Sequence, residues 1–262
     1  MQSVLKAFDV LFAVAYADTP PNVATLSSDL ALPRPTVHRI LDTLTTAGVV
    51  TRRDPDKGFV VTPKLALASS ASQNTATLAD MIVPYLHRLV AISEETSSLH
   101  LRVGDLRICA AEVEGSRGIR WARGPGWSAP IWAGAVGRML LAGVGVDELD
   151  EILQRSRPRS LASNTVVDES RLRQLVCDVR TMGWSASTSE TVDGAAAVAA
   201  PIITANGHTI AALSMYASAD RLPQMESLAS QLCAIADDAA AQWDKISTLQ
   251  NTRPATRETT TV

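Results

Sequence analysis

The break between two short helical segments near the N-terminus most constrains how this chain can fold. The first segment repeats Val23, Leu26 and Leu30 at three- and four-residue spacing, which places them on one face of a helix. Pro33 ends that helix, because proline forces the residue before it into extended backbone. A second helix is predicted to begin near Pro35, whose fixed φ suits a first helical turn. Its apolar stripe consists of Val37, Ile40, Leu41 and Leu44. The spacing therefore predicts a helix-turn-helix.

The opposite face of the second helix carries polar and cationic side chains. An arginine can bind guanine through two hydrogen bonds in the major groove, and a threonine can contact a thymine methyl group or a phosphate. A DNA recognition helix needs one face that packs and one face of this kind. The residues predicted to contact DNA from this helix are Arg34, Thr36, His38, Arg39 and Thr43.

Two short β runs follow Gly48, which is predicted to end the second helix in a left-handed conformation. They cover residues 49–52 and 59–62, and the turn-forming residues 54–58 join them as a hairpin. This hairpin would be the wing of a winged helix-turn-helix, where cationic side chains can contact phosphates. Those predicted to do so are Arg52, Arg53 and Lys57. An alternative remains open, in which the region is a small helical core whose charges are merely solvated.

Residues 2–17 have the apolar pattern of an amphipathic helix. Asn22 is a candidate N-cap for the helix that follows. We expect the apolar face to complete a three-helix core, and contact with a second copy in a dimer is the alternative. The residues expected on the buried face are Val4, Leu5, Phe8, Leu11, Phe12 and Ala15.

The stretch LPRPTVHRILDTLTTAGVV at residues 32–50 resembles the winged helix-turn-helix of the IclR family of bacterial transcriptional regulators. AVGRMLLA (135–142), VAAPI (198–202) and AALSMY (211–216) resemble blocks of that family's effector domain, in the same order. Family members usually have glycine in the interhelical turn and a small hydroxyl residue capping the recognition helix, whereas this chain has Ala31 and Pro35. The resemblance spans residues 2–245 and implies a GAF-like effector domain in a homodimer or a dimer of dimers.

Charge is nearly balanced where DNA binding is predicted. Residues 1–65 hold seven Lys/Arg and six Asp/Glu, in a chain of net charge −3. One copy of this region, the DNA-binding head, can therefore neutralise only a few phosphates. Pairing of two heads on a palindromic operator of double-stranded DNA would restore the affinity for DNA. No apolar run is long enough to span a membrane, no signal-peptide pattern is evident, and three scattered cysteines fit neither a disulfide framework nor a metal site. These features predict a cytoplasmic protein.

The chain is expected to have four parts: a DNA-binding head at residues 1–65, a linker at 66–94, an effector-binding body at 95–248 and a disordered tail at 249–262. A linker helix is predicted over residues 75–94, with Pro84 kinking it. In the body, helices and strands alternate in an order typical of an antiparallel sheet with helices on it, which is an α+β fold. Strands are predicted at 97–103, 106–113, 118–122, 184–189, 195–203 and 208–216, and helices at 133–141, 147–154, 168–182 and 223–246.

The body lacks the common sequence marks of an enzyme. It has no G-x-S-x-G, H-E-x-x-H or phosphate-loop motif, and the four histidines are scattered. Neither a catalytic site, a metal nor a cofactor is therefore predicted. We expect the body to bind a small molecule without transforming it.

Four of the five tryptophans fall between residues 121 and 184. Aromatic walls with a few polar groups are typical of a small-molecule pocket, although packing within the core explains such tryptophans equally well. Trp121 is a candidate on this ground. The family resemblance implies that the pocket is lined by Trp132, Gly134, Ala135, Ser187, Ala197, Ser214 and Tyr216. A flat aromatic or carboxylate effector would suit these side chains.

Together these features predict a ligand-responsive transcriptional regulator, and more specifically a repressor of a catabolic operon. Effector binding would shift the population of body conformations and so change operator affinity. Two alternatives remain: a transcriptional activator, and a ligand-binding module whose head contacts proteins instead of DNA.

Overall fold

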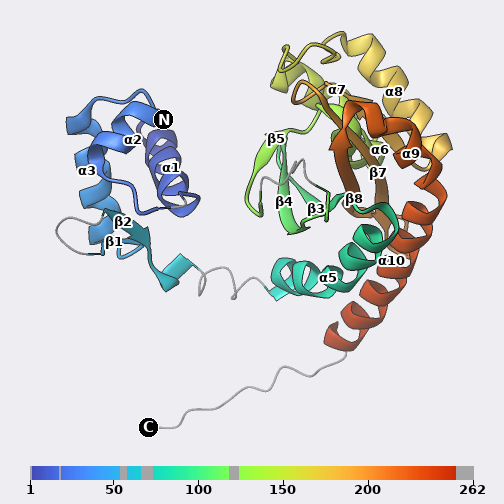
Figure 1. Ribbon diagram of the computed structural model, residues 1–262, viewed down its shortest axis with the longest axis horizontal. Helices are drawn as coiled ribbons and strands as arrows, with labels where there is room; N and C mark the ends of the chain where they lie inside the picture. The colour runs from blue at the N-terminus through green and yellow to red at the C-terminus, as the bar shows by residue number, and fades with distance from the viewer. Residues whose placement is uncertain (1, 18, 54–57, 66–72, 118–123, 252–262) are drawn as a thin grey trace. The chain divides into compact units, whose positions relative to one another are not determined.

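The structure, a computed structural model, describes residues 2–17, 19–53, 58–65, 73–117 and 124–251. The chain forms two compact units, Met1–Ala76 and Thr77–Val262 (Figure 1). The predicted strand at 118–122, the predicted wing turn with Lys57, and the predicted tail from residue 252 onward lie outside the described residues. Among the described residues, none of the helices combines the length and the apolar character that crossing a membrane requires.

The smaller unit is the predicted winged helix-turn-helix. Three helices, α1 (Gln2–Ala15), α2 (Val23–Asp29) and α3 (Arg34–Thr46), precede the strands β1 (Val50–Arg52) and β2 (Phe59–Val61). The two strands pair antiparallel. Apolar side chains from all three helices and from β1 form one core, which contains Val10, Leu11, Val14, Leu26, Val37, Leu41 and Val50.

The ends of the helices explain where the chain turns. The Asn22 side chain accepts hydrogen bonds from the backbone N–H groups of Ala24 and Thr25 at 2.8 and 2.9 Å, so the predicted N-cap of α2 is confirmed. Gly48 follows α3 with a φ of +70°, as predicted for a left-handed residue after the helix. In the interhelical turn Ala31 has a φ of +50°. Glycine adopts this conformation with less strain than alanine, so Ala31 stores strain at the turn.

The buried face of α1 differs from the prediction. The residues that α1 contributes to the core are Val10, Leu11 and Val14, so of the residues predicted to be buried only Leu11 is in the core. Apolar side chains surround most of this helix, and periodicity alone could not decide which stripe packs on α2 and α3. The predicted core residues that are instead exposed are Val4, Leu5, Phe8, Phe12 and Ala15.

The larger unit is built on one antiparallel sheet of six strands in the order β5-β4-β3-β8-β7-β6. Gly104 and Asp105, which lie between the strands predicted at 97–103 and 106–113, form the hairpin turn that joins β3 to β4. The short edge strand β5 was not predicted, because three residues ending in proline are too few for a periodic pattern. The strands are β3 (Thr96–Val103), β4 (Leu106–Val113), β5 (Ser128–Pro130), β6 (Ser185–Thr188), β7 (Ala195–Ile203) and β8 (Thr209–Ser218).

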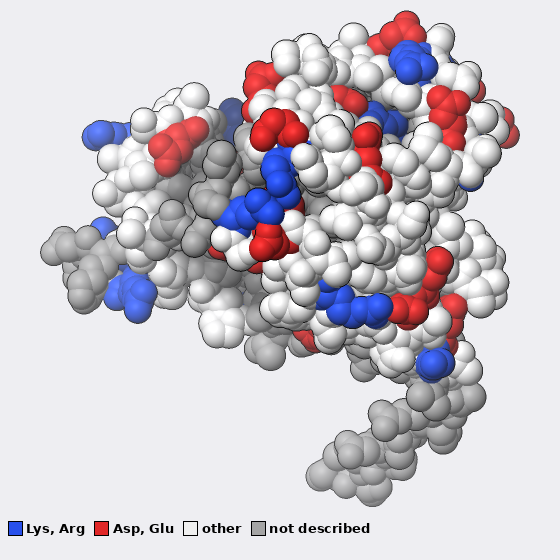
Figure 2. Space-filling view, turned by 45° about the vertical axis from the view of Figure 1, so that its right-hand side comes forward, with Lys and Arg blue, Asp and Glu red and all other residues white. Residues whose placement is uncertain are grey.

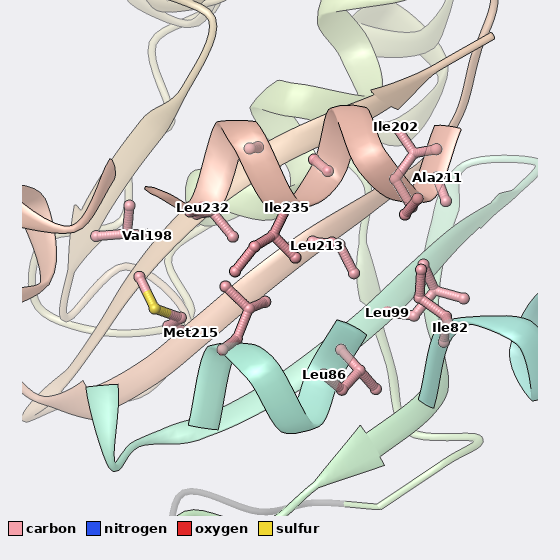
Figure 3. Close-up of a cluster of buried hydrophobic side chains, with 14 of the residues drawn as sticks. Ile82, Leu86, Leu99, Val198, Ile202, Ala211, Leu213, Met215, Leu232 and Ile235 are labelled. Atoms are coloured by element: carbon pink, nitrogen blue, oxygen red, sulfur yellow. The ribbon is translucent and has the colours of Figure 1, made fainter. Parts of the chain in front are cut away.

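Helices cover both faces of this sheet (Figure 1). The linker helix α5 (Gln73–Ser93), which contains Pro84, and the C-terminal helix α10 (Ala229–Asn251) lie on one face. Their apolar side chains interdigitate with those of the central strands, as Figure 3 shows for Leu86, Leu213 and Ile235. The opposite face is covered by α6 (Gly134–Ala142), with α7 (Val146–Ser156) and α8 (Glu169–Met182) packed beside it. The sheet is therefore the middle layer of an α+β domain.

The C-terminal helix predicted at residues 223–246 is interrupted. A 3₁₀ turn at Ala219–Arg221 leads into α9 (Leu222–Ser227), and Leu228 separates α9 from α10. The helix α10 continues to Asn251, so the prediction that the tail begins at residue 249 is wrong by three residues. Apolar side chains continue on one face across the break, since Met225, Leu232 and Ile235 are buried in the sheet core.

Gly137 should be indispensable for the position of α6. A Cβ atom there would lie 2.0 Å from the carbonyl oxygen of Ile131, which is backbone and cannot move aside. We expect Gly137→Ala to destabilise the larger unit by about 1–3 kcal/mol, although alanine is the better helix former. Gly145→Ala is the control, because nothing lies within 4 Å of a Cβ at Gly145. All five tryptophans belong to this unit, so urea unfolding followed by tryptophan fluorescence measures its stability. Equal midpoints for the two variants would contradict the packing argument.

Candidate functional site

The exposed face of α3 carries cations that the described residues of the head do not neutralise. Arg34 and Arg39 are exposed, and among the described residues no carboxylate lies within 4.0 Å of either guanidinium. Thr36 is partly buried, whereas Thr43 is exposed and donates its hydroxyl to the Arg39 carbonyl at 2.8 Å. The helix thus presents two unpaired arginines on the side opposite its packed stripe.

His38 is less available for contact with DNA than the sequence suggested. Its Nδ1 atom lies 2.9 Å from the Asp42 carboxylate, one turn further along α3. The pair is exposed to solvent, where such contacts contribute little to stability. A DNA contact by His38 would therefore have to replace a local one.

The wing is attached to the head by its backbone. Gly58 has a φ of +80°, and a Cβ atom there would lie 2.3 Å from the Pro20 carbonyl oxygen. Phe59 donates its N–H to the carbonyl of Pro21 at 3.0 Å. The Arg52 guanidinium lies over the Phe59 ring, 5.7 Å from its centroid, and Arg53 is exposed. Both arginines are placed where a wing can meet phosphate.

In the larger unit, most of the predicted effector residues meet beneath α6. Ser187, Ala197 and Tyr216 are register partners across β6, β7 and β8. Ser214 lies on the same face of β8, paired with Ser98 and Ala199. Small side chains at these positions let the helix approach the sheet closely.

The beginning of α6 lies directly over this row. The Ala135 N–H donates to the Ser187 hydroxyl at 3.0 Å. Gly134 has a φ of +74°, and a Cβ there would lie 3.5 Å from Ser187 Oγ and from Thr191 Cγ2. The structure therefore brings Gly134, Ala135, Ser187, Ala197 and Tyr216 together.

Beside this cluster is a pocket with a volume of about 30 Å³. That is room for roughly one or two water molecules, so a six-membered ring would need the rim to open. The wall includes Tyr216 and two residues of the β6–β7 loop, Thr191 and Val192. The described lining residues are His100, Glu112, Trp127, Thr191, Val192, Ala195 and Tyr216.

A chain of hydrogen bonds leads from this pocket into the sheet. Arg107 Nη1 donates to Tyr216 Oη at 3.1 Å, and Tyr216 Oη lies 3.1 Å from His100 Nε2. His100 Nε2 also lies 3.0 Å from the Ser98 hydroxyl, which lies 3.1 Å from that of Ser214. Buried polar groups that are linked in this way hold each other in place.

A β-bulge brings the charged members of this region to one face. The register between β3 and β4 shifts between Leu99 and His100, so that His100 pairs with Cys109 while Ser98 pairs with Glu112. Without the bulge Arg107 and Glu112, an odd number of residues apart, would point to opposite faces. With it, both share the face that α6 covers.

Burial controls the protonation of the groups in the wall. It holds the pKa of His100 well below 6.5, and the nearby Arg107 charge lowers it further, so the imidazole is neutral. Burial, with the Glu112 charge, raises the pKa of the Cys109 thiol to about 12. The thiol is therefore protonated and is not a nucleophile.

The β6–β7 loop, which lines the pocket, is tied to α6 by a buried ion pair. Arg138 donates to the Glu190 carboxylate at 2.7 Å, to the Ser185 hydroxyl at 3.1 Å and to the Ala186 carbonyl at 2.6 Å. Glu190 directly precedes Thr191, which lines the pocket. Movement of the loop would therefore be transmitted to α6.

The structure separates the tryptophans. Trp127 lines the pocket, whereas Trp132 is only 1% exposed, belongs to the core under α6 and borders a different surface hollow with Asp105 and Arg157. Trp184 packs against the core on the other face of the sheet. Trp121 lies outside the described residues. Of the two explanations for the tryptophans, core packing fits Trp132 and Trp184, and a pocket wall fits Trp127.

Sequence reasoning did not identify His100 or Arg107 as site residues, and it considered Trp127 only as one of four clustered tryptophans. His100 and Arg107 each look like an ordinary strand residue, and only the register of β3, β4 and β8 places them beside Tyr216. Gly124 and Gly126 lie in a turn that precedes Trp127. It is fixed to β4, because Gly126 donates its N–H to the Cys109 carbonyl at 2.7 Å.

Two family models match this chain, and together they cover most of it. The IclR helix-turn-helix domain matches residues 3–54, and the bacterial transcriptional regulator IclR C-terminal domain matches residues 71–245. The chain belongs to the IclR family. The predicted family and the α+β architecture are thereby confirmed.

Curated members of the IclR family are similar over most of their length. The chain is 26% identical over 210 residues to the HTH-type transcriptional regulator BhcR of Paracoccus denitrificans, covering 80% of this chain and 75% of that protein. It is 27% identical over 227 residues to the Pca regulon regulatory protein of Pseudomonas putida, covering 86% and 77%. These relatives are transcriptional regulators, which confirms the prediction that an IclR chain of this kind is not an enzyme.

A solved IclR homologue from Microbacterium hydrocarbonoxydans, complexed with 4-hydroxybenzoate, has the same fold. It superimposes with a TM-score of 0.72 at 21% identity, covering 92% of this chain and 99% of the other. At this level of identity the likeness concerns the fold.

The charge distribution of the IclR effector unit differs from that of a DNA-binding surface. Figure 2 shows Lys and Arg side chains interspersed with Asp and Glu over the larger part of the visible face. Several are joined in ion pairs, such as Arg88 with Asp238 and Arg102 with Glu148. The unpaired arginines of α3 therefore remain the best candidates for binding phosphate and bases.

Acid should destabilise the effector unit through His100. Because the folded-state pKa lies below that of the unfolded chain, the unfolded chain gains a proton first as the pH falls below about 6.5. Stability that is present above this pH is then lost, by up to about 1.4 kcal/mol per pH unit. Urea unfolding between pH 7.5 and 5 should show this loss, and His100→Gln should reduce the slope. His208→Gln, an exposed histidine of the same unit, should leave the slope unchanged. Identical slopes for all three proteins would rule out His100 as the cause.

Proposed function

We propose that this chain is a ligand-responsive repressor that binds double-stranded operator DNA of a catabolic operon. The observation that carries the proposal is the pair of unpaired arginines on the exposed face of α3, in a head of the helix-turn-helix type. Arg34, Thr36, His38, Arg39 and Thr43 would contact bases and phosphates, with Arg52, Arg53 and Lys57 on the wing. The work of such a protein is done in the cytoplasm, where the DNA is.

The effector in this proposal is a small aromatic or carboxylate molecule bound under α6. Its site comprises Gly134, Ala135, Ser187, Ala197, Ser214 and Tyr216, which lie around or beside the pocket. Trp121 and Trp132 stay candidates on sequence grounds, although Trp132 packs in the core. The IclR homologue solved with 4-hydroxybenzoate supports an aromatic acid as the class to test first.

The mechanism is a shift between two populations of the effector unit. The pocket in the structure is small, at about 30 Å³, so a ligand would bind a state with a wider pocket better and draw molecules into it. Opening moves the β6–β7 loop, and the Arg138–Glu190 pair transmits that movement to α6. Operator affinity then changes because the linker helix α5 is packed on the same sheet.

The proposed assembly is a homodimer or a dimer of dimers, with α1 at a contact between heads. The exposed large apolar residues of α1 are 48–63% exposed and follow one side of the helix. Phe8, Phe12 and Tyr16 also contact one another in sequence, with ring centroids about 6 Å apart. An apolar stripe of this kind on a soluble unit is typical of a protein contact. The stripe consists of Val4, Leu5, Phe8, Phe12 and Tyr16.

A second candidate function is a ligand-binding module whose head contacts a protein, and replacing Arg39 separates the two. We expect Arg39→Ala to weaken binding to the operator by about 1–3 kcal/mol, roughly 5- to 150-fold, because an arginine on a recognition helix can read guanine. Fluorescence anisotropy on labelled DNA flanking the protein's own gene, at two salt concentrations and with and without aromatic acids, measures this. An activator would bind the same DNA but raise transcription in a reporter assay.

Arg171→Ala is the matched control for Arg39→Ala. Arg171 is an exposed residue of α8, and its removal changes the net charge equally without touching the head. If the wild-type protein does not bind this DNA at either salt concentration, or if the two variants weaken binding equally, the operator-binding role is not supported. Binding that weakens with salt and changes with one acid would support both parts of the proposal.

Negative charges introduced into the apolar stripe of α1 should dissociate the proposed dimer. We expect Phe8→Glu with Phe12→Glu to halve the molecular mass measured by analytical ultracentrifugation and to lower affinity for a palindromic site, because a buried unpaired charge opposes association. Val146→Glu, at an exposed apolar residue of α7, should change neither. An unchanged mass and affinity for the α1 variant would place the contact between copies elsewhere.

A further inference from the structure

The larger unit has a second hollow, where the end of α7 meets the β3–β4 turn and the edge strand β5. Its volume is about 380 Å³, which lies in the range of small-molecule sites, whereas the pocket beside α6 has about 30 Å³. We call it the α7 hollow. Its lining has an apolar part, formed by Leu106, Pro130 and Trp132, and a polar part that includes Asp105, Arg157 and Arg159.

Two arginines in this lining are not neutralised. Arg157 and Arg159 are exposed, and among the described residues neither guanidinium makes an ion pair or a side-chain hydrogen bond. One exposed arginine of this kind is ordinary, as Arg171 on α8 illustrates. Two of them in the wall of one hollow, beside apolar side chains, suit an anion that also has an organic part.

The carboxylate in the described part of the lining is already paired. Arg155 donates to both oxygens of Asp105 at 2.6 Å, and this contact lowers the pKa of Asp105, so the carboxylate stays ionised. Glu148 and Glu151 lie near Arg155 on α7, but neither is among the described residues that line the hollow. The lining therefore has two positive charges that its own carboxylate does not balance.

The backbone at Arg157 is strained. Arg157 ends α7 with a φ of 47° and a ψ of 80°, a left-handed conformation that glycine adopts with less strain and usually occupies at the end of a helix. Pro158 follows directly and favours extended backbone at the residue before it. Strain that persists at a non-glycine residue is characteristic of functional sites. Pro158 also restricts the chain between the two arginines, which reduces the entropy lost when both bind one ligand.

We propose that the α7 hollow is a second ligand site, which binds a small organic molecule bearing a phosphate monoester. Such a group carries nearly two negative charges at neutral pH and several acceptor oxygens, and a planar guanidinium can donate two parallel hydrogen bonds to it. The organic part would lie on Leu106, which is 42% exposed, and on Pro130. This inference goes beyond the proposed function, because the hollow shares no described lining residue with the pocket beside α6.

Isothermal titration calorimetry with phenyl phosphate tests this inference on the full chain. Phenyl sulfate is the matched ligand, because it has nearly the same shape and one negative charge instead of two. At low salt and neutral to slightly basic pH, we expect the wild-type protein to bind phenyl phosphate about tenfold or more tightly than phenyl sulfate. Inorganic phosphate should bind more weakly than phenyl phosphate, since it has no group that can lie on Leu106 and Pro130.

Variants of the two arginines separate binding from folding. Arg159→Ala should weaken the binding of phenyl phosphate about tenfold. Arg157→Gly should weaken it by a similar factor while leaving the urea midpoint of the larger unit nearly unchanged, because relief of the left-handed strain offsets the greater freedom of glycine in the unfolded chain. An arginine with only a structural role would not lose binding and keep stability in this way.

Two control variants locate the bound phosphate. Arg171→Ala removes an exposed arginine of the same unit that is not among the described lining residues of the hollow. Arg39→Ala removes an exposed arginine of the DNA-binding head. Both proteins should bind phenyl phosphate as the wild type does.

Several outcomes would overturn the assignment of this site. They are an absence of phenyl phosphate binding, equal binding of phenyl sulfate, and wild-type binding by the Arg157 and Arg159 variants. Equal weakening by Arg171→Ala, or loss of binding in Arg39→Ala, would place the phosphate elsewhere and overturn it as well. Operator binding by the wild-type protein is measured separately, so either the second ligand site or the proposed function can fail while the other stands.

Discussion

The close packing of α6 on the sheet is the constraint on which the rest of the effector unit depends. Gly137 lies against the backbone of Ile131 with no room for a side chain, and the strand positions below α6 are small, with Ala197, Ala199 and Ala212 in its core. Because the helix approaches so closely, the backbone N–H of Ala135 reaches the hydroxyl of Ser187 in the sheet. The same approach leaves little space for a ligand, and the pocket beside α6 has a volume of only about 30 Å³.

Polar residues within this packed layer give it a single arrangement. The Ser98, His100 and Tyr216 side chains are linked across β3 and β8, and Arg138 joins α6 to β6 and its following loop. Such networks contribute more to specificity than to stability, because each buried polar group must first lose its water. A regulator needs two states of similar free energy. A network that holds one state, while some buried polar atoms of the described residues have no hydrogen-bond partner, is suited to that purpose.

The two units differ in how their charges are distributed. The head is nearly neutral overall, so its arginines act locally on one helix face, and affinity for DNA would depend on more than one head binding at once. The apolar stripe left on α1 provides a surface for that pairing. The effector unit carries charges of both signs, many of them paired, and Arg107, which is buried and has no carboxylate within 4.0 Å among the described residues, lies behind the pocket wall.

The sequence by itself determined the units and most of their helices and strands. Val37 and Leu41 on a helical period, the proline break at Pro33 and the Asn22 cap act over a few residues, and local chemistry of that kind can be read directly from the chain. The paired positions Ser187, Ala197 and Tyr216 also followed from sequence, although through family resemblance and not through physics.

Only the tertiary structure decided which apolar face is buried and which charges meet. α1 is apolar on two sides, and its burial depends on where α2 and α3 lie. Arg107 and Glu112 share a face only because a bulge shifts the register between Leu99 and His100, and Trp132 lies in the core instead of the pocket wall because of how α6 packs. These outcomes depend on contacts between residues far apart in the chain, which neither periodicity nor composition encodes.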